Sequence, residues 1–237
     1  MSGMNASQAI AKVNKKGMLL VFPINNKREP ASLWYEFFPR TEMRWEWDEN
    51  GDSRVSDLWH LREKLSRSGK VVYSKWFRGR ATLISFELFP ALLKVTGGVE
   101  LAARRQLSFN GKEVLDLLDE DSPLSTKALK RAADLQGREM ERVYNAATKE
   151  LFSRCLIVGF GEVDEGAFPS LAVGSTRVLF EDLWREAAEM DLDDAWKIVD
   201  KFLPKGTPFR KYCDSVAKEA AKLLEEEPVA DFDLEAE

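Results

Sequence analysis

Residues 111–180 contain the pattern that decides the expected fold. In order they read GKEVLDLLDED (111–121), SPLSTKALKRAADL (122–135), GREMERVYNAATKELFSR (137–154), CLIVGFGEV (155–163) and SLAVGSTRVLF (170–180). The first three stretches have helical periodicity, with Ser125 as an N-cap, and the last two are strand-like runs joined by a short acidic turn. Three helices followed by a two-stranded wing predict a winged helix-turn-helix unit.

A less complete version of this order precedes it. A helical pattern starts at Val55 and ends at Gly69, and KVVYSKWF (70–77) and RATLISF (80–86), with Gly79 at the bend, predict a β-hairpin. We therefore predict an α+β, mainly helical protein with tandem winged helix-turn-helix units and short β-hairpin wings. The expected parts are a flexible N-terminal arm (1–16), a first winged-helix-like unit (17–110), a second winged-helix unit (111–190), a C-terminal helical segment (191–224) and an acidic tail (225–237).

The composition is that of an ordinary soluble protein, with 237 residues, 44% hydrophobic and 32% charged. Apolar runs stay far below the roughly 20 residues that a membrane span needs, and the chain opens without a leader pattern. We expect a cytoplasmic protein without membrane contact. Cys155 and Cys213 have no second ligand at a metal-binding spacing, so we interpret both as packing residues and expect no metal site.

The formal net charge of −5 is unevenly distributed. Residues 219–237 carry eight acidic side chains and one lysine, which leaves a net charge of +2 on the remainder. An acidic run of this kind is usually a solvated end of the chain. It is also compatible with a segment that shields a basic surface until a stronger polyanion arrives.

The third helix of residues 111–180 has two faces. An apolar stripe runs from Met140 to Leu151, and a polar stripe on the far side of the helix consists of Arg138, Arg142, Asn145 and Lys149. Arginine binds phosphates and guanine edges, and asparagine pairs with adenine, so these four side chains are candidate DNA contacts. The alternative is a solvated helix face, which the neighbouring Glu139 and Glu141 favour.

The first hairpin adds further cations. Seven cations and one glutamate give residues 60–80 a net charge of +6, and the candidate DNA contacts on the hairpin are Lys75, Arg78 and Arg80. Strand alternation predicts that Tyr73, Trp76 and Phe77 are packed while the cations point outward. The second wing instead carries Glu162, Asp164 and Glu165, so we expect it to contribute little to phosphate binding.

Catalytic signals are weak. His60 is the chain's one histidine and has no nucleophile motif nearby, and neither G-x-G-x-x-G nor GxxxxGK[ST] occurs. We therefore expect no cofactor and no bound nucleotide. Trp45, Trp47 and Trp59 cluster around a turn, and strand-like alternation of the first two favours packing over a DNA-inserting wedge.

Several stretches taken together resemble a known family. These are DLWHLREKLSRSGKVVYSKWFRGRATLISFELFPALL, PLSTKALKRAADL, KELFSRCLIVGFGEVDEGAFPSL and VLFEDLW. They are similar to the winged-helix DNA glycosylases typified by AlkZ and YcaQ, and in particular to the shorter AlkZ-related proteins. The resemblance implies a tandem winged-helix scaffold with a concave basic surface for duplex DNA and, in the true glycosylases, cleavage of the N-glycosidic bond of an altered base.

The catalytic motif of those glycosylases is not recognisable in this chain. The motif is a glutamine, an apolar residue, and a glutamine or aspartate, whereas Gln8, Gln106 and Gln136 are followed two positions later by other residues. We expect a protein related to DNA repair that binds double-stranded DNA. One alternative is a glycosylase with a divergent active site, with Glu36, Glu42 and Glu46 as speculative candidates. Another is a non-catalytic module that binds a protein partner.

Overall fold

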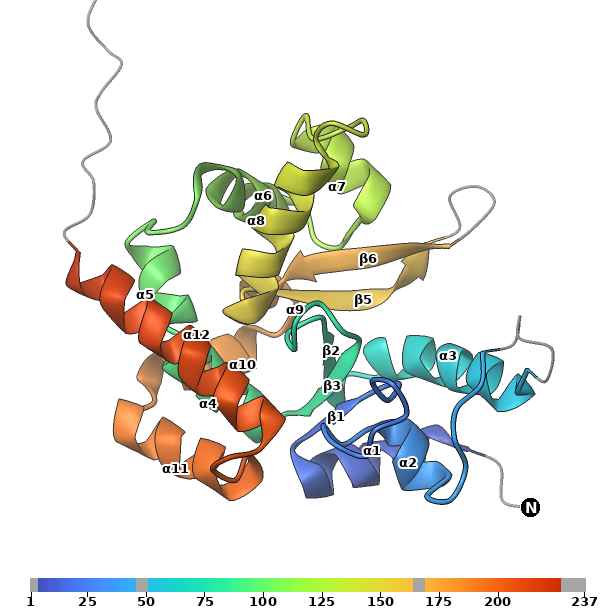
Figure 1. The fold of residues 1–237 in the computed structure, drawn as a ribbon. Coiled ribbons are helices and arrows are strands. Elements are labelled where there is room, and N and C mark those ends of the chain that lie inside the picture. Colours follow the sequence, from blue (N-terminus) through green and yellow to red (C-terminus); the bar gives the residue numbers. More distant parts are fainter. Residues whose placement is uncertain (1–3, 46–50, 164–168, 227–237) are drawn as a thin grey trace, which may run out of the picture.

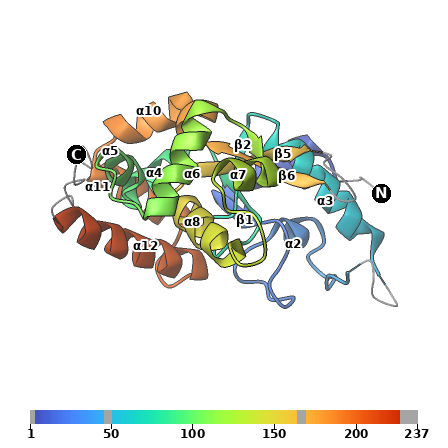
Figure 2. The same cartoon turned by 90° about the horizontal axis from the view of Figure 1, so that it is seen from above.

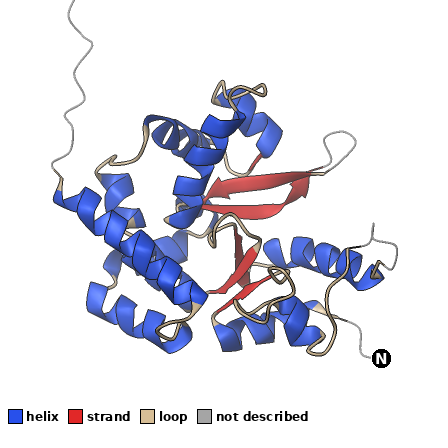
Figure 3. Ribbon diagram, viewed as in Figure 1, coloured by secondary structure: helices blue, strands red, loops and turns tan. Residues whose placement is uncertain are grey.

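The computed structural model describes residues 4–45, 51–163 and 169–226, and it has an α+β fold that is mainly helical with one small antiparallel sheet (Figures 1 and 3). The N-terminal part of the fold is built from six elements. They are α1 (Ala6–Lys16), β1 (Met18–Leu20), α2 (Leu33–Phe37), α3 (Ser53–Ser66), β2 (Val71–Ser74) and β3 (Thr82–Ser85).

The middle of the chain contains the pattern that predicts a winged helix-turn-helix unit. Its elements are α6 (Phe109–Glu120), β4 (Leu124–Ser125), α7 (Thr126–Ala132), α8 (Glu141–Ser153), β5 (Ile157–Val163) and β6 (Ser170–Ser175). Ser125 caps α7 by accepting a hydrogen bond from the backbone N–H of Ala128 at 3.0 Å, as the sequence predicts. Strand β6 pairs antiparallel with β5 on one side and with β4 on the other.

Six further helices complete the described fold. They are α4 (Leu88–Val95), α5 (Gly98–Ala103), α9 (Thr176–Leu179), α10 (Glu181–Glu189), α11 (Leu192–Phe202) and α12 (Pro208–Glu225). The sequence predicts the helical character of residues 191–224, but it does not predict α4 and α5. Figure 2 shows α4, α5 and α10–α12 at one end of the molecule and α3 at the other.

One sheet joins the two halves of the chain. Its strand order is β1-β3-β2-β5-β6-β4, and the junction is the pairing of Tyr73 on β2 with Gly159 on β5. A Cβ on Gly159 would lie 2.3 Å from the Tyr73 ring, so glycine is what allows this close approach. The hairpins of the two predicted units are therefore parts of a single sheet.

Alternation along the strands of the N-terminal part creates a hydrophobic core on each face. Leu19, Tyr73 and Leu83 pack with α1, α2 and α3, whereas Leu20 and Ile84 pack into a larger core with the remaining helices. The larger core also contains both cysteines, which are buried, in agreement with the interpretation of Cys155 and Cys213 as packing residues.

The prediction that residues 1–16 form a flexible arm is wrong for residues 6–16, which form α1. Asn5 caps this helix by accepting a hydrogen bond from the N–H of Gln8 at 2.8 Å, and Ala9 and Val13 are fully buried. Ala6, Ala9, Ile10 and Val13 have the spacing of a helix face. The small alanine side chains make this periodicity weak in the sequence, but they let the helix pack closely against the sheet.

Candidate nucleic-acid interface

A cleft of about 380 Å³ lies between the β2–β3 turn and helices α7 and α8. Figure 1 shows this turn reaching toward the C-terminal end of α8. The basic cleft, as we call it, is lined by Lys75, Arg78, Gly79, Thr126, Lys130, Glu141, Tyr144, Asn145, Thr148, Lys149, Phe152, Leu171 and Val173. Four cations and one carboxylate make its lining strongly positive.

The structure brings together four of the seven side chains that the sequence singles out as DNA contacts. Lys75 and Arg78 come from the β2–β3 turn, whereas Asn145 and Lys149 come from α8, and all four line the basic cleft. Arg80, Arg138 and Arg142 do not line it, although all three are exposed. Arg138 precedes α8, which begins at Glu141, so the prediction that Arg138 lies on this helix is wrong.

The β2–β3 turn is held in place by aromatic packing beneath it. Trp76 and Phe77 are buried, and their rings make edge contacts with the ring of Tyr212 on α12 at 4.9 and 5.4 Å. Arg78 and Gly79 both adopt positive φ, and the N–H of Gly79 donates to the carbonyl of Lys75 at 3.1 Å. The packed rings and the tight turn together present the Arg78 side chain to solvent at the edge of the basic cleft.

Helix α8 supplies the opposite wall. Its periodicity buries Tyr144 and Thr148 and leaves Asn145 and Lys149 exposed, as the sequence predicts for its polar face. Arg142 follows the same spacing one turn nearer the N-terminal end of the helix, and it is also exposed. The polar face of α8 therefore continues from the basic cleft toward the beginning of the helix.

An ion pair that the sequence analysis does not identify lies inside the cleft. Lys130 on α7 contacts Glu141 at 2.5 Å between Nζ and Oε2, and the same ammonium lies 4.7 Å from the centre of the Tyr144 ring. Lys130 lowers the pKa of the Glu141 carboxyl through this hydrogen bond. Asn145 donates a longer hydrogen bond of 3.4 Å to the same carboxylate. Glu141 thus partly offsets the positive charge of the cleft.

Lys75 has an unusual environment for a lysine. Its side chain is half-buried just after the end of β2, and among the described residues its ammonium has neither a hydrogen bond nor an ion pair. Burial lowers the pKa of Lys75, and the nearby positive charge of Arg62 lowers this pKa further. Its amine is therefore more easily deprotonated than that of an exposed lysine.

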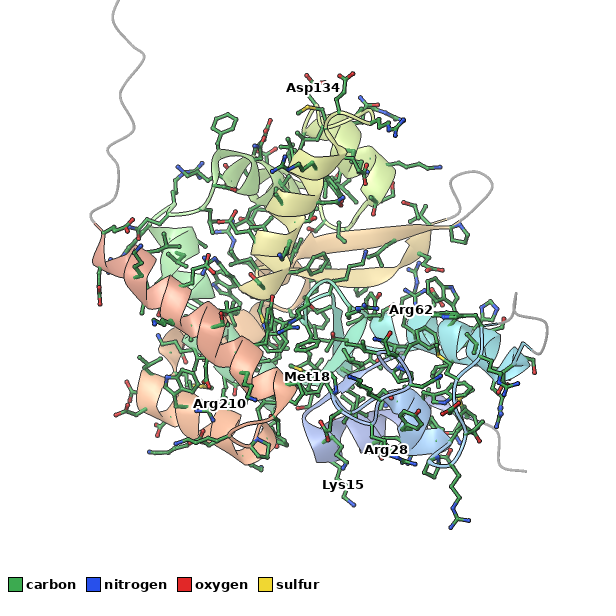
Figure 4. The ribbon with its side chains drawn as sticks, in the orientation of Figure 1. Lys15, Met18, Arg28, Arg62, Asp134 and Arg210 are labelled. Atoms are coloured by element: carbon green, nitrogen blue, oxygen red, sulfur yellow. The ribbon has the colours of Figure 1, made fainter. Side chains whose placement is uncertain are left out.

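The prediction that the cations of the first hairpin region all point outward is wrong for Arg62. Arg62 on α3, which is labelled in Figure 4, is 2% exposed and forms an ion pair with Glu162 on β5. The Nη2 of Arg67 also donates to the carbonyl of Glu162 at 2.7 Å. Strand β5 is thus attached to α3, and the charge of Glu162 is neutralised within the fold. Asp164 and Glu165 lie outside the described residues.

The aromatic cluster is only partly buried. Trp59 is 42% exposed, its ring is stacked on Phe22 at 6.4 Å, and the Arg62 guanidinium lies 4.0 Å from the ring centre. Trp45 packs against the same phenylalanine at 5.4 Å, but it is not in a strand, which corrects that prediction. Trp47 lies outside the described residues.

Two of the speculative catalytic groups, Glu36 and Glu42, do not line the basic cleft. Glu36 on α2 lies 3.7 Å from the ammonium groups of Lys12 and Lys16, and Glu42 is exposed in a loop. Glu46 lies outside the described residues. Gln106 donates to the carbonyls of Leu223 and Glu226 at 3.0 and 2.8 Å, which joins it to the end of α12.

No group of three or more His, Cys, Asp or Glu side chains is arranged to hold a metal ion within residues 4–45, 51–163 and 169–226. In the same part of the chain, every helix is too short or too polar to span a bilayer.

The sequence matches the family described as AlkZ related over residues 4–212. Comparisons with curated proteins and with solved structures found no match. The family match begins just before α1 and extends into α12, so it includes both hairpins and every element that lines the basic cleft. The chain therefore belongs to the AlkZ-related family, whose name relates it to the DNA-repair glycosylase AlkZ.

Proposed function

We propose that this protein binds double-stranded DNA in the basic cleft, through a winged helix-turn-helix unit formed by α6, β4, α7, α8, β5 and β6. The observation that carries the proposal is the convergence of Lys75 and Arg78 with Lys130 and Lys149 from the opposite wall. Phosphate groups repeat along a duplex, so cations from two walls can contact phosphates on both sides of a groove.

The order of the elements supports a winged helix-turn-helix unit. Strand β4 pairs with the second strand of the hairpin that follows α8, which matches the arrangement of a short strand, two helices and a wing. In this proposal α8 is the recognition helix, and Asn145 and Lys149 face the DNA together with Arg142. Arg80 and Arg138 contact phosphates on either side of the cleft.

Membership of the AlkZ-related family supports a role in DNA repair. The proposed role is recognition of duplex DNA at or near damage, with the contacts made mainly to phosphates. A cleft whose charged residues are mostly cations and that has one candidate base-reading amide, that of Asn145, favours binding with little sequence preference.

The proposal is tested by measuring the affinity for a labelled duplex by fluorescence anisotropy across a salt series. Each phosphate contact contributes about 0.9 to the slope of log affinity against log salt. We therefore expect Arg78→Ala with Lys149→Ala to weaken binding and to lower this slope by about 2. Lys15→Ala is the matched control, because Lys15 is exposed on α1 and points away from the cleft (Figure 4). Absence of binding at low salt, or equal losses in both variants, would refute the proposal.

A second candidate is a DNA glycosylase with a divergent active site, and the AlkZ-related family membership favours it. Of the described carboxylates, Glu141 is the one that lines the basic cleft, whereas Glu36 is held by lysines of α1. The test is incubation with a duplex containing an alkylated purine, followed by an assay for abasic sites. Their appearance with the wild-type protein and their loss in Glu141→Gln would support catalysis, whereas an unmodified duplex would exclude this activity for that lesion.

A further inference from the structure

The environment of Lys75 suits a nucleophilic amine. Lys75 is half-buried just after the end of the interior strand β2 and lines the basic cleft, and no described carboxylate pairs with it. The nearest contrast is Lys130, whose ammonium is held by Glu141 at 2.5 Å in the same cleft. A lysine with a salt bridge keeps its proton and its position, whereas an unpaired, partly desolvated lysine has a larger fraction of free amine.

The charges around Lys75 act in the same direction. Arg62 is buried on α3 and lowers the pKa of Lys75, in addition to the larger effect of burial. Desolvation next to another cation is the arrangement that activates lysines which form Schiff bases with carbonyl substrates. The cleft thus places a deprotonatable amine beside two exposed phosphate-binding cations, Arg78 and Lys149.

Duplex DNA offers an aldehyde, the kind of carbonyl group that an amine converts into an imine, where a base is missing. Where a base has been lost, the deoxyribose opens to an aldehyde at C1′, while intact nucleotides have no aldehyde. We propose that Lys75 forms a Schiff base with the C1′ aldehyde of an abasic site bound in the basic cleft. This inference rests on the proposed DNA binding and specifies the substrate of the same cleft.

The covalent step is balanced without any additional reagent. The lone pair of the Lys75 amine attacks C1′, the carbonyl oxygen leaves as water with two protons, and a C=N bond replaces the C=O bond. The protonated imine then withdraws electrons from C2′, so that a C2′ proton passes to water. The electron pair of that C–H bond forms a C2′–C3′ double bond and expels the 3′ phosphate, which breaks the strand.

The rest of the cleft fits the same substrate. Arg78 and Lys149 lie on opposite walls, where they bind the phosphates on either side of the missing base. Tyr144 and Phe152 supply apolar surface against which the abasic sugar packs. An intact nucleotide would need more space at this position. An abasic sugar needs less space than a nucleotide and is not constrained by stacking, so it can approach the half-buried Lys75 more easily than an intact nucleotide can.

The test is reductive trapping with borohydride, which converts the imine into a stable amine. The full-length protein is mixed with a labelled duplex carrying one abasic site, borohydride is added, and the covalent adduct is separated by denaturing electrophoresis. We expect an adduct with the wild-type protein, at least tenfold less with Lys75→Arg, and peptide mapping that locates the modification at Lys75. The matched control Lys15→Arg removes an exposed amine far from the cleft and is expected to give the wild-type yield.

Anisotropy with the same abasic duplex separates the two proposals. Binding without a trapped adduct, or an adduct that maps to another amine, overturns the Schiff base but leaves DNA binding intact. Absence of binding to both abasic and intact duplex overturns both proposals. Lys75→Arg keeps the positive charge, and Lys75→Met is a second variant that keeps a flexible side chain without an amine. Normal abasic-duplex binding by Lys75→Arg with no adduct distinguishes a chemical role from a structural one.

Discussion

The guanidinium of Arg62 on α3 forms a buried ion pair with the carboxylate of Glu162 at the far end of β5. Arg62 also donates to the hydroxyl of Tyr73 at 3.3 Å, and Tyr73 pairs with Gly159 on the same strand as Glu162. The backbone pairing and the ion pair thus join the same two parts of the chain. These contacts hold the two walls of the basic cleft in a common framework.

Removal of one partner from this ion pair is expected to destabilise the fold. Glu162→Ala leaves the Arg62 charge buried without its carboxylate, so we expect a loss of about 3 kcal/mol in the free energy of unfolding. Urea denaturation provides the measurement. Asp182→Ala breaks the exposed Arg185–Asp182 pair and serves as the control, with an expected loss below about 1 kcal/mol. Equal losses in the two variants would contradict the structural role assigned to Glu162.

Gly159→Ala is expected to disturb the junction between β2 and β5. The added methyl group would lie 2.3 Å from Cδ1 of Tyr73, and the ring has little room to move because Tyr73 is buried. Overpacking of this kind costs about 1–3 kcal/mol. Thermal unfolding should therefore show a lower midpoint. Gly137→Ala is a useful comparison, because Gly137 has open space around it and only its positive φ opposes the substitution.

Glu141→Gln is expected to strengthen DNA binding if the proposed function is correct. The substitution removes the carboxylate from the cleft and frees Lys130, whose ammonium is otherwise held at 2.5 Å. One additional phosphate contact would raise the salt slope by about 0.9. The anisotropy salt series measures this change. A slope that stays constant would mean that Lys130 does not reach the DNA.

Tyr144 should make stability depend on pH in the alkaline range. Burial raises the pKa of Tyr144 to about 12, from an ordinary value of 10.0, because it disfavours the phenolate. Because the pKa of Tyr144 is higher in the folded state than in the unfolded state, its contribution to the free energy of unfolding is complete below pH 10. This contribution is lost as the pH rises toward 12. A pKa difference of about two units corresponds to a loss of about 2.7 kcal/mol in the free energy of unfolding.

The comparison for this prediction is Tyr144→Phe, which has no phenol to ionise. The variant loses the hydrogen bond between Tyr144 and Thr126, so it should be less stable than wild type below pH 10. Between pH 10 and 12 the difference should shrink or reverse, as measured by urea denaturation of both proteins. A constant difference across this range would show that Tyr144 titrates at its ordinary pKa.

Local sequence patterns predict much of the middle of the chain. Ser125 caps α7, the apolar stripe of α8 is buried, and the strands of both hairpins occur where β-branched and aromatic residues alternate with turn signals. These features depend on neighbouring residues and on backbone geometry. Helix α1 is different, because its alanine-rich face becomes recognisable only when the sheet that covers it is present.

The sequence by itself determined the helical and strand character of most segments, the excess of cations in residues 60–80 and the polar face of α8. The tertiary structure decided which of these cations act together. It buried Arg62, joined it to Glu162, and brought Lys75 and Arg78 to the same cleft as Lys130 and Lys149. The physical reason is that periodicity specifies the side of an element on which a residue lies, whereas contacts between distant segments arise from packing of those sides in a shared core.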